Sequence, residues 1–176
     1  ETDIAARAGD HYQAIYRIGQ IFPVPVLEDM RDALPTIKPS VFLAVPRVWE
    51  KFKAGLEARI EENPKKDLIA KAIQNGLEKV DYEQKGESVP FMVGLKDKIF
   101  AKLVFSKFKE GLGIVDTEYF VTAAAPMNKD VHRWFHAIGI DVTEIYGMTE
   151  DTGPATIGVP GNCLLYTSPS PRDTVT

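Results

Sequence analysis

The chain is poor in cysteine, since Cys163 is the only one among 176 residues. An internal disulfide framework is therefore excluded, and a reducing compartment is expected. Long apolar runs are also missing: none approaches the roughly 20 residues that a membrane-spanning helix needs. Basic residues are not in excess either, because the formal net charge is −4. That charge argues against general nucleic-acid binding.

What remains is the composition of a soluble globular protein, with 44% hydrophobic and 26% charged residues, enough to bury one core. Apolar spacing predicts both helices and strands. Residues 20–25 read as a strand that two prolines confine to a sheet edge, and 41–45 as a strand buried on both faces. Helices are expected at 11–18, at 27–34 and from Pro46 to Pro64. Two further helices each carry an apolar stripe. The first stripe is Leu68, Ile69, Ala72, Ile73, Leu77 and Val80, and the second is Phe91, Leu95, Ile99, Leu103 and Phe108.

A strand–loop–helix–strand pattern occupies residues 118–146. Residues 118–122 are aromatic and β-branched, and a side-chain-poor bend follows at 123–126. Asn128 is the expected N-cap of the helix, Gly139 its C′ residue, and 141–146 the second strand. This is a βαβ unit, so the two loops after its strands should lie at the carboxyl edge of a parallel sheet, where such sheets bind ligands.

The second of these loops carries Tyr146, Gly147, Met148, Thr149 and Glu150. An aromatic ring can stack on a base, a glycine permits close backbone approach, and a hydroxyl can hydrogen-bond a phosphate oxygen. Mg²⁺ prefers one or two carboxylates together with substrate phosphates. The plainer alternative is an ordinary strand-to-loop turn with an exposed carboxylate.

Three segments together resemble a known family. Ala123-Ala124-Ala125-Pro126 and the run from Tyr146 to Glu150 are similar to motifs of the adenylate-forming superfamily. The run from Lys38 to Lys51, with Pro46-Arg47-Val48-Trp49-Glu50, resembles its long-chain fatty acid–CoA ligase branch. The resemblance covers nearly everything from His11 to about Gly161. Trp49 also belongs to a helical apolar stripe, so no chemistry is assigned to that segment.

The resemblance implies an α/β fold that forms part of the large N-terminal domain of such an enzyme, with parallel-sheet βα units and helices packed on the faces. It implies a ligase that activates a fatty acid with ATP to acyl-AMP and transfers the acyl group to coenzyme A. Glu150 would then hold Mg²⁺, and Thr149 would hydrogen-bond phosphate. The nucleotide-binding residues that it implies are Ala124, Ala125, Pro126, Glu144, Ile145, Tyr146, Gly147, Met148 and Thr149.

The same resemblance marks the chain as an internal fragment. Residues 1–162 would form part of the adenylation domain, without its phosphate loop and without the C-terminal domain that carries the catalytic lysine, so the fragment alone should be inactive. Residues 163–176 leave the βα rhythm and resemble translated sequencing-adapter sequence; the alternative is a genuine Pro/Ser-rich tail. Tyr166-Thr167-Ser168 imitates the start of a phosphate loop but has neither its glycines nor its lysine.

Other readings stay open. The chain could belong to another adenylate-forming ligase, aryl-acid or luciferase-like, or to a non-catalytic nucleotide-binding or interaction module. His132 and His136 lie one helical turn apart, and we interpret them as a solvated helix flank rather than a metal site. Lysines between the phenylalanines of residues 91–109 could rest on an anionic membrane, although a solvated face is commoner. We expect a cytoplasmic protein, or one peripheral at the inner face of a membrane, with small-molecule substrates and no nucleic acid.

Overall fold

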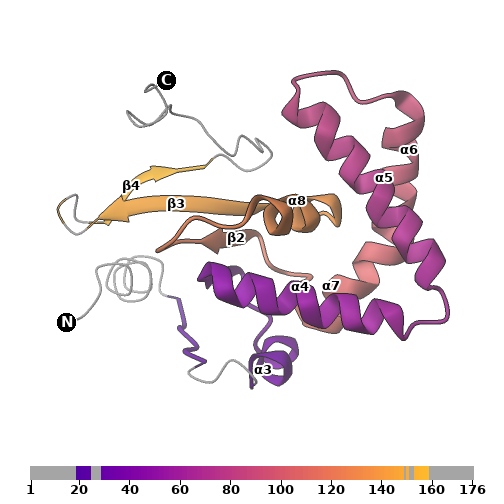
Figure 1. Cartoon of the computed structure of the whole chain (residues 1–176). Coiled ribbons are helices and arrows are strands. Elements are labelled where there is room, and N and C mark those ends of the chain that lie inside the picture. Colours follow the sequence, from indigo (N-terminus) through magenta and orange to yellow (C-terminus); the bar gives the residue numbers. More distant parts are fainter. Residues whose placement is uncertain (1–18, 25–28, 149, 151–152, 159–176) are drawn as a thin grey trace.

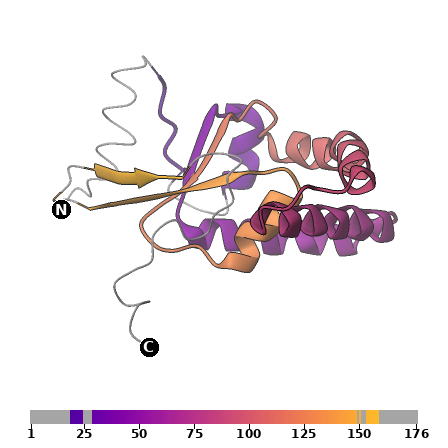
Figure 2. The same ribbon diagram turned by 90° about the horizontal axis from the view of Figure 1, so that it is seen from above.

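The computed structural model of the chain describes residues 19–24, 29–148, 150 and 153–158 (Figure 1). A small sheet lies on one side of a group of helices, and the longest helices extend away from the sheet (Figures 1 and 2). The elements in chain order are α3 (Met30–Ile37), β1 (Val41–Ala44), α4 (Pro46–Glu61), α5 (Lys66–Gln84), α6 (Phe91–Phe100), the π-helical turn η3 (Ala101–Phe105), α7 (Ser106–Leu112), β2 (Tyr119–Thr122), α8 (Lys129–Ala137), β3 (Val142–Met148) and β4 (Gly153–Ile157).

The sheet has the order β1-β2-β3-β4, and its first three strands are parallel. Phe120 of β2 pairs with Phe42 of β1 on one side and with Val142 of β3 on the other. Strand β4 runs antiparallel to β3. The α/β class and the βαβ unit β2–α8–β3 are thus confirmed, and the carboxyl ends of β2 and β3 meet at one edge of the sheet.

The core is built around Trp49, which is almost fully buried. Pro46 stands in the first turn of α4, where its missing N–H leaves no hydrogen bond unmade. From there the helix places Trp49 against Phe42 of β1, Phe120 of β2 and Phe135 of α8, with ring centroids 5.1–6.2 Å apart in edge-to-face contacts. Such aromatic pairs contribute about 0.5–1.5 kcal/mol each beyond their burial. These ring contacts pack α4 and α8 against one face of the sheet.

Helix α8 begins and ends as its sequence predicts. The Asn128 side chain accepts a hydrogen bond from the Asp130 N–H at 2.8 Å, and Gly139 follows the helix with a φ of 76°. Helix α5 crosses it closely at Gly76, where any added Cβ would collide with the carbonyl oxygen of Ala137. The glycine therefore sets how near α5 and α8 can approach.

Three expectations about the first half of the chain are wrong. Residues 20–24 form no regular strand. The helix expected at 27–34 does not end before Pro35: α3 runs from Met30 to Ile37, and residues 27 and 28 lie outside the described residues. A helix this short loses only one internal hydrogen bond to the proline. The left-handed Lys38 closes it. Strand β1 is buried on one face only, because Val41 and Leu43 stay exposed. The helix expected at 11–18 lies outside the described residues.

The third long helix differs most from expectation. It is divided into α6, η3 and α7, and its core-facing side chains are Val93, Val104 and Phe105 rather than the expected stripe. Of that stripe, only Phe108 packs against the core cluster. The other four members are exposed: Phe91, Leu95, Ile99 and Leu103. Among the described residues, no helix combines the length and apolar character needed to cross a bilayer.

Candidate active site

The site expected from the sequence lies at the carboxyl edge of β2 and β3. Thr122, the last residue of β2, pairs in register with Glu144 of β3. The chain leaves β2 into the loop 123–126, while β3 continues four residues further, to Met148. The loop and the outer half of β3 therefore lie side by side, which brings together the two motifs found in the sequence.

Ala124 has a left-handed backbone, with a φ of 75°. This conformation is sterically unfavourable for any residue with a Cβ, and it costs of order 1–2 kcal/mol. Such residues gather at functional sites, where the surrounding structure holds them. Glycine is the residue usually found at a left-handed position, so three consecutive alanines do not indicate a positive φ. The bend at 123–126 is thus confirmed, and its strain is a new finding.

The Glu144 side chain holds this loop. Its Oε1 accepts a hydrogen bond from the backbone N–H of Met127 at 2.8 Å, and the residue is half-buried. Met127 itself is buried in the core. In the sequence, Glu144 is expected to be one of the nucleotide-binding residues. In the structure, one of its carboxylate oxygens joins the first loop to β3.

The second motif is a hairpin and not a turn. Tyr146, Gly147 and Met148 are part of β3 and pair with β4, with a register shift between Tyr146 and Gly147. The expectation that Gly147 and Met148 lie in a loop after the strand is therefore wrong. The irregularity between Tyr146 and Gly147 is a bulge inside the ladder, which bends the strand. The Tyr146 ring is 61% exposed and free to meet a flat ligand. Ile145 is half-buried behind it.

Glu150 follows the strand in an exposed position, and no hydrogen bond or ion pair joins it to the other described residues. Thr149 lies outside the described residues. A free, solvated carboxylate suits Mg²⁺, which keeps several waters and takes one or two carboxylates beside substrate phosphates. Nowhere in residues 19–24, 29–148, 150 and 153–158 do three or more His, Cys, Asp or Glu side chains form a metal-binding group. The exposed carboxylate of Glu150 has the chemistry to hold a metal ion together with phosphate oxygens.

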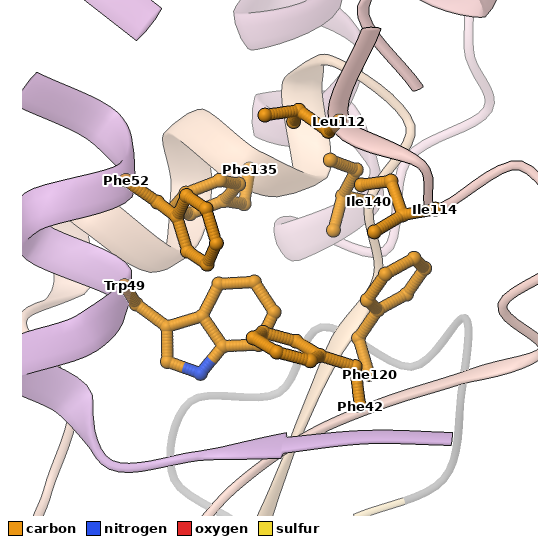
Figure 3. Close-up of a pocket in the computed structure, with 8 residues that line it drawn as sticks. All are labelled: Phe42, Trp49, Phe52, Leu112, Ile114, Phe120, Phe135 and Ile140. Atoms are coloured by element: carbon orange, nitrogen blue, oxygen red, sulfur yellow. The ribbon is translucent and has the colours of Figure 1, made fainter. Parts of the chain in front are cut away.

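A cavity inside the core is not part of this site. It is lined only by apolar side chains, with Trp49 and Phe120 on one side and Leu112 and Ile140 on the other (Figure 3). Its volume of about 10 Å³ is close to that of a single water probe. Such a space is a packing defect and leaves no room for a fatty acid or a nucleotide.

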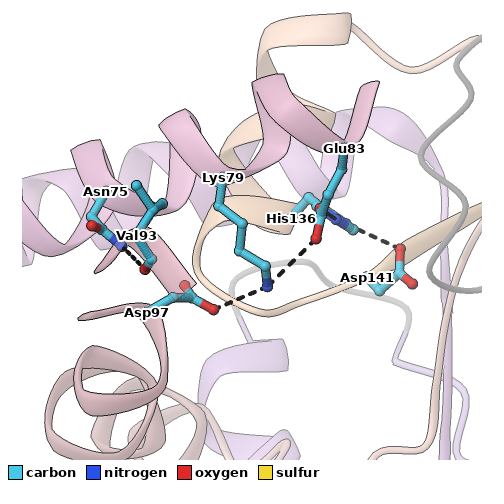
Figure 4. A network of polar contacts seen from close by, with 7 residues as sticks. All are labelled: Asn75, Lys79, Glu83, Val93, Asp97, His136 and Asp141. Atoms are coloured by element: carbon cyan, nitrogen blue, oxygen red, sulfur yellow. Dashed lines mark hydrogen bonds and ion pairs between the residues drawn. The ribbon is translucent and has the colours of Figure 1, made fainter. Parts of the chain in front are cut away.

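The two histidines are structural, and the solvated helix flank expected for them is wrong. His132 is buried, and its Nε2 lies 2.7 Å from the carbonyl oxygen of Val142, to which it donates. His136 lies between two carboxylates, with Nε2 at 3.1 Å from Glu83 and Nδ1 at 3.3 Å from Asp141 (Figure 4). The Asp141 carboxylate, followed by Glu83, raises the pKa of His136 above its ordinary value despite burial.

Further charges extend this network along α5. Lys79 reaches Asp97 of α6 at 3.0 Å and Glu83 at 3.8 Å, and Arg133 of α8 pairs with Asp81 (Figure 4 shows the lysine). Asp141 precedes β3, so the network sits at the amino end of that strand, opposite the carboxyl edge. It fixes α8 against α5 and the sheet, and touches none of the candidate site residues.

Comparison with known proteins agrees with the motifs. The family model described as AMP-binding enzyme matches residues 14–174. A Mycobacterium tuberculosis protein with the provisional name fatty-acid–CoA ligase fadD11 is 35% identical over 151 residues, which is 84% of this chain and 26% of that protein. The long-chain-fatty-acid–CoA ligase ACSBG2 of Rattus norvegicus is 35% identical over 131 residues, 70% of this chain and 18% of its own length.

The Homo sapiens ACSBG2 is 31% identical over 145 residues, which is 76% of this chain and 20% of that protein. The chain thus spans about a quarter or less of the length of these curated relatives. No solved structure matches it significantly.

Proposed function

Because this chain belongs to the family of AMP-binding enzymes, we propose that it is part of a fatty acid–CoA ligase. The reaction has two halves. The carboxylate of the acid attacks the α-phosphate of ATP, which forms acyl-AMP and releases pyrophosphate. The thiol of coenzyme A then attacks the acyl carbon and displaces AMP, which leaves the thioester. The names of the relatives support a fatty acid as the substrate.

The observation that carries the proposal is the joint placement of the loop after β2 and the outer half of β3. The loop with the strained Ala124 is joined to Glu144 of β3 through the N–H of Met127, and the exposed Tyr146 lies two residues further along that strand, at the carboxyl edge of the parallel strands. Open α/β sheets bind their ligands at that edge. A preformed, side-chain-poor bend next to an exposed aromatic ring is suited to a flat base.

We assign the roles accordingly. Tyr146 stacks on adenine, Ala124, Ala125 and Pro126 line the adenine and the acyl carboxylate, and Thr149 hydrogen-bonds phosphate. Attack by an anion on a polyanion needs charge neutralisation and positioning, which supply most of the rate enhancement in such reactions. Mg²⁺, when bound, supplies positive charge at the phosphates, and Glu150 is the residue that would hold it. Tyr146 is held within the ladder of β3 and β4, and Glu150 follows two residues after the end of β3.

The chain by itself should not complete the reaction. Its sequence contains no Gly/Ser/Thr-rich phosphate loop with a lysine, and removal of even one positioned electrostatic donor costs roughly a hundredfold or more in rate. We propose that residues 1–162 form one wall of the site. The remaining groups would come from other parts of a longer polypeptide, of which this chain would be about a quarter by comparison with its relatives.

The test is the first half-reaction in a longer protein that contains this chain. ATP–pyrophosphate exchange that depends on palmitate, followed by AMP release that depends on coenzyme A, is the expected result. Exchange driven by an aryl acid but not by palmitate would favour the other adenylate-forming ligases. Nucleotide binding without any exchange would favour a non-catalytic binding module.

A further inference from the structure

The outer face of α6 and of the adjoining η3 carries a row of exposed apolar side chains. Phe91 is 80% exposed and Leu103 62%, and Met92, Leu95 and Ile99 are also exposed. Four of these residues follow one another at intervals of four: Phe91, Leu95, Ile99 and Leu103. We call the five the α6 stripe. Its part on α6, from Phe91 to Ile99, extends about 12 Å along the helix at 1.5 Å per residue.

Lysines border the α6 stripe on both sides. At about 100° per residue, Phe91 and Ile99 project about 40° to either side of Leu95. Lys98 projects about 60° from Leu95 on one side and Lys96 about 100° on the other. Both lysines are exposed, as is Lys102 in the following turn. Their methylene stems can lie along an apolar surface while the ammonium groups reach outward.

The opposite face of the helix is already occupied. Val93 is buried, and its carbonyl oxygen accepts a hydrogen bond from the Asn75 side chain of α5 at 3.2 Å (Figure 4). Asp97 is the only acidic residue between Phe91 and Leu103, and it points to Lys79 of α5 at 3.0 Å. The exposed face of α6 is therefore apolar and cationic, because the one carboxylate of this segment, Asp97, pairs with Lys79 of α5.

We propose that the α6 stripe docks this protein on an anionic phospholipid bilayer. A helix that lies in the plane of a membrane has an apolar face flanked by lysines, and it gains both from apolar burial and from attraction to acidic headgroups. Phe91, Leu95 and Ile99 would enter the acyl-chain boundary, while Lys96, Lys98 and Lys102 meet phosphate and carboxylate groups. Charge complementarity selects this partner over another protein segment, which would need acidic residues around an apolar strip.

Flotation with vesicles tests this without nucleotide or acid, so its outcome is independent of the ligase activity. The 176-residue chain and a longer protein that contains it are mixed with vesicles of phosphatidylcholine, or of phosphatidylcholine with phosphatidylserine as about a quarter of the lipid. We expect both proteins to float only with the anionic vesicles. Binding should weaken as salt rises from about 0.1 M to about 1 M, where the Debye length shrinks to about 3 Å.

Matched variants separate the stripe from general surface effects. Ile99→Asp with Leu103→Asp should weaken binding about tenfold or more, whereas Leu68→Asp with Val115→Asp, at exposed apolar positions on other elements, should not. Lys98→Glu with Lys102→Glu should weaken it about fivefold or more for each charge. Lys38→Glu, at the end of α3, with Arg47→Glu, in the first turn of α4, makes the same change in net charge on other elements and should have little effect.

A fluorophore keeps the test decisive if a stripe variant fails to fold. In a Cys163→Ser background, an environment-sensitive dye at Phe91→Cys should shift to the blue on anionic vesicles, and the same dye at Leu68→Cys should not. Equal binding to neutral and anionic vesicles, or equal losses in stripe and control variants, would overturn the proposal. So would flotation of the chain but not of the longer protein, because the stripe would then be covered by another part of that polypeptide.

Discussion

Glu144 and Met127 are joined by a hydrogen bond of 2.8 Å from the backbone N–H of Met127 to the carboxylate of Glu144. The bond spans from β3 to the loop after β2, so it links the two segments that carry the candidate nucleotide motifs. The loop it holds contains the left-handed Ala124. If the proposed nucleotide site is right, Glu144 would be a positioning residue that acts on the ligand through the backbone of the loop.

Replacement of Glu144 by alanine should raise the KM for ATP in a longer ligase that contains this chain. The bond to a charged acceptor is worth about 1.5–3 kcal/mol, and without it the bend is no longer held in place. Glu144→Gln keeps an oxygen that can accept from Met127, so it should restore most of the affinity. Steady-state kinetics with varied ATP measure this. An alanine variant with an unchanged KM would show that the loop is held by other contacts.

Ala124→Gly should leave the free energy of unfolding unchanged or raise it by up to about 1 kcal/mol. Glycine removes the steric penalty of a positive φ, and this gain offsets the entropy that glycine loses on folding. Ala123→Gly is the control, since Ala123 has no positive φ; it should destabilise by about 0.5–1 kcal/mol. Urea denaturation of the chain compares the two. Equal losses in both variants would mean that Ala124 is not strained.

The interaction of His136 with Glu83 and Asp141 should make stability depend on pH. The folded state raises the pKa of His136, first through Asp141 and then through Glu83. The stabilisation is therefore complete below the ordinary histidine pKa of about 6.5 and is lost as pH rises through the higher folded value. Despite burial, Asp97 raises the pKa of Lys79 above its ordinary value, so Lys79 stays charged across this range and adds no slope.

Unfolding free energies measured between about pH 5.5 and pH 8.5 should fall with rising pH in the wild type, and His136→Gln should flatten that fall. Glu83→Gln should reduce it in part. A wild-type stability that rises over this range would contradict the assignment of the charged imidazole to these carboxylates.

Deletion of residues 163–176 should leave the stability of the chain unchanged or slightly higher. The segment departs from the βα pattern of the rest of the sequence, so we expect it to have no partner in the core. Thermal unfolding of the truncated and full chains makes the comparison. A loss well beyond the roughly 0.5 kcal/mol usual for neutral surface changes would show that the tail packs on the domain.

Local chemistry explains which elements were predictable. Asn128, Gly139 and Pro46 act through their own backbone and side chain, so the sequence predicts both ends of α8 and the start of α4. The βαβ order follows from the alternation of apolar patterns. Apolar periodicity does not predict which face of a helix packs against the core. The four apolar residues at helical spacing from Phe91 to Leu103 face outward.

The site was predictable in part for the same reason. The sequence placed two motifs after two adjacent parallel strands, and topology brings them together. The conformation of Ala124 and the contact from Glu144 to Met127 depend on tertiary structure, and alanine and glutamate carry no signal for either. The hairpin of β3 with β4 was missed because Gly147 suggested a turn where it accompanies a bulge.

The adenylation site is tested most directly by Glu150→Gln in a longer ligase that contains this chain. Glutamine keeps the shape of the side chain and removes the charge that would hold Mg²⁺. Palmitate-dependent ATP–pyrophosphate exchange should fall mainly in kcat and recover in part at raised Mg²⁺. Glu118→Gln, at the opposite end of β2, should behave as wild type. Wild-type exchange by the Glu150 variant at ordinary Mg²⁺ would remove this residue from the active site.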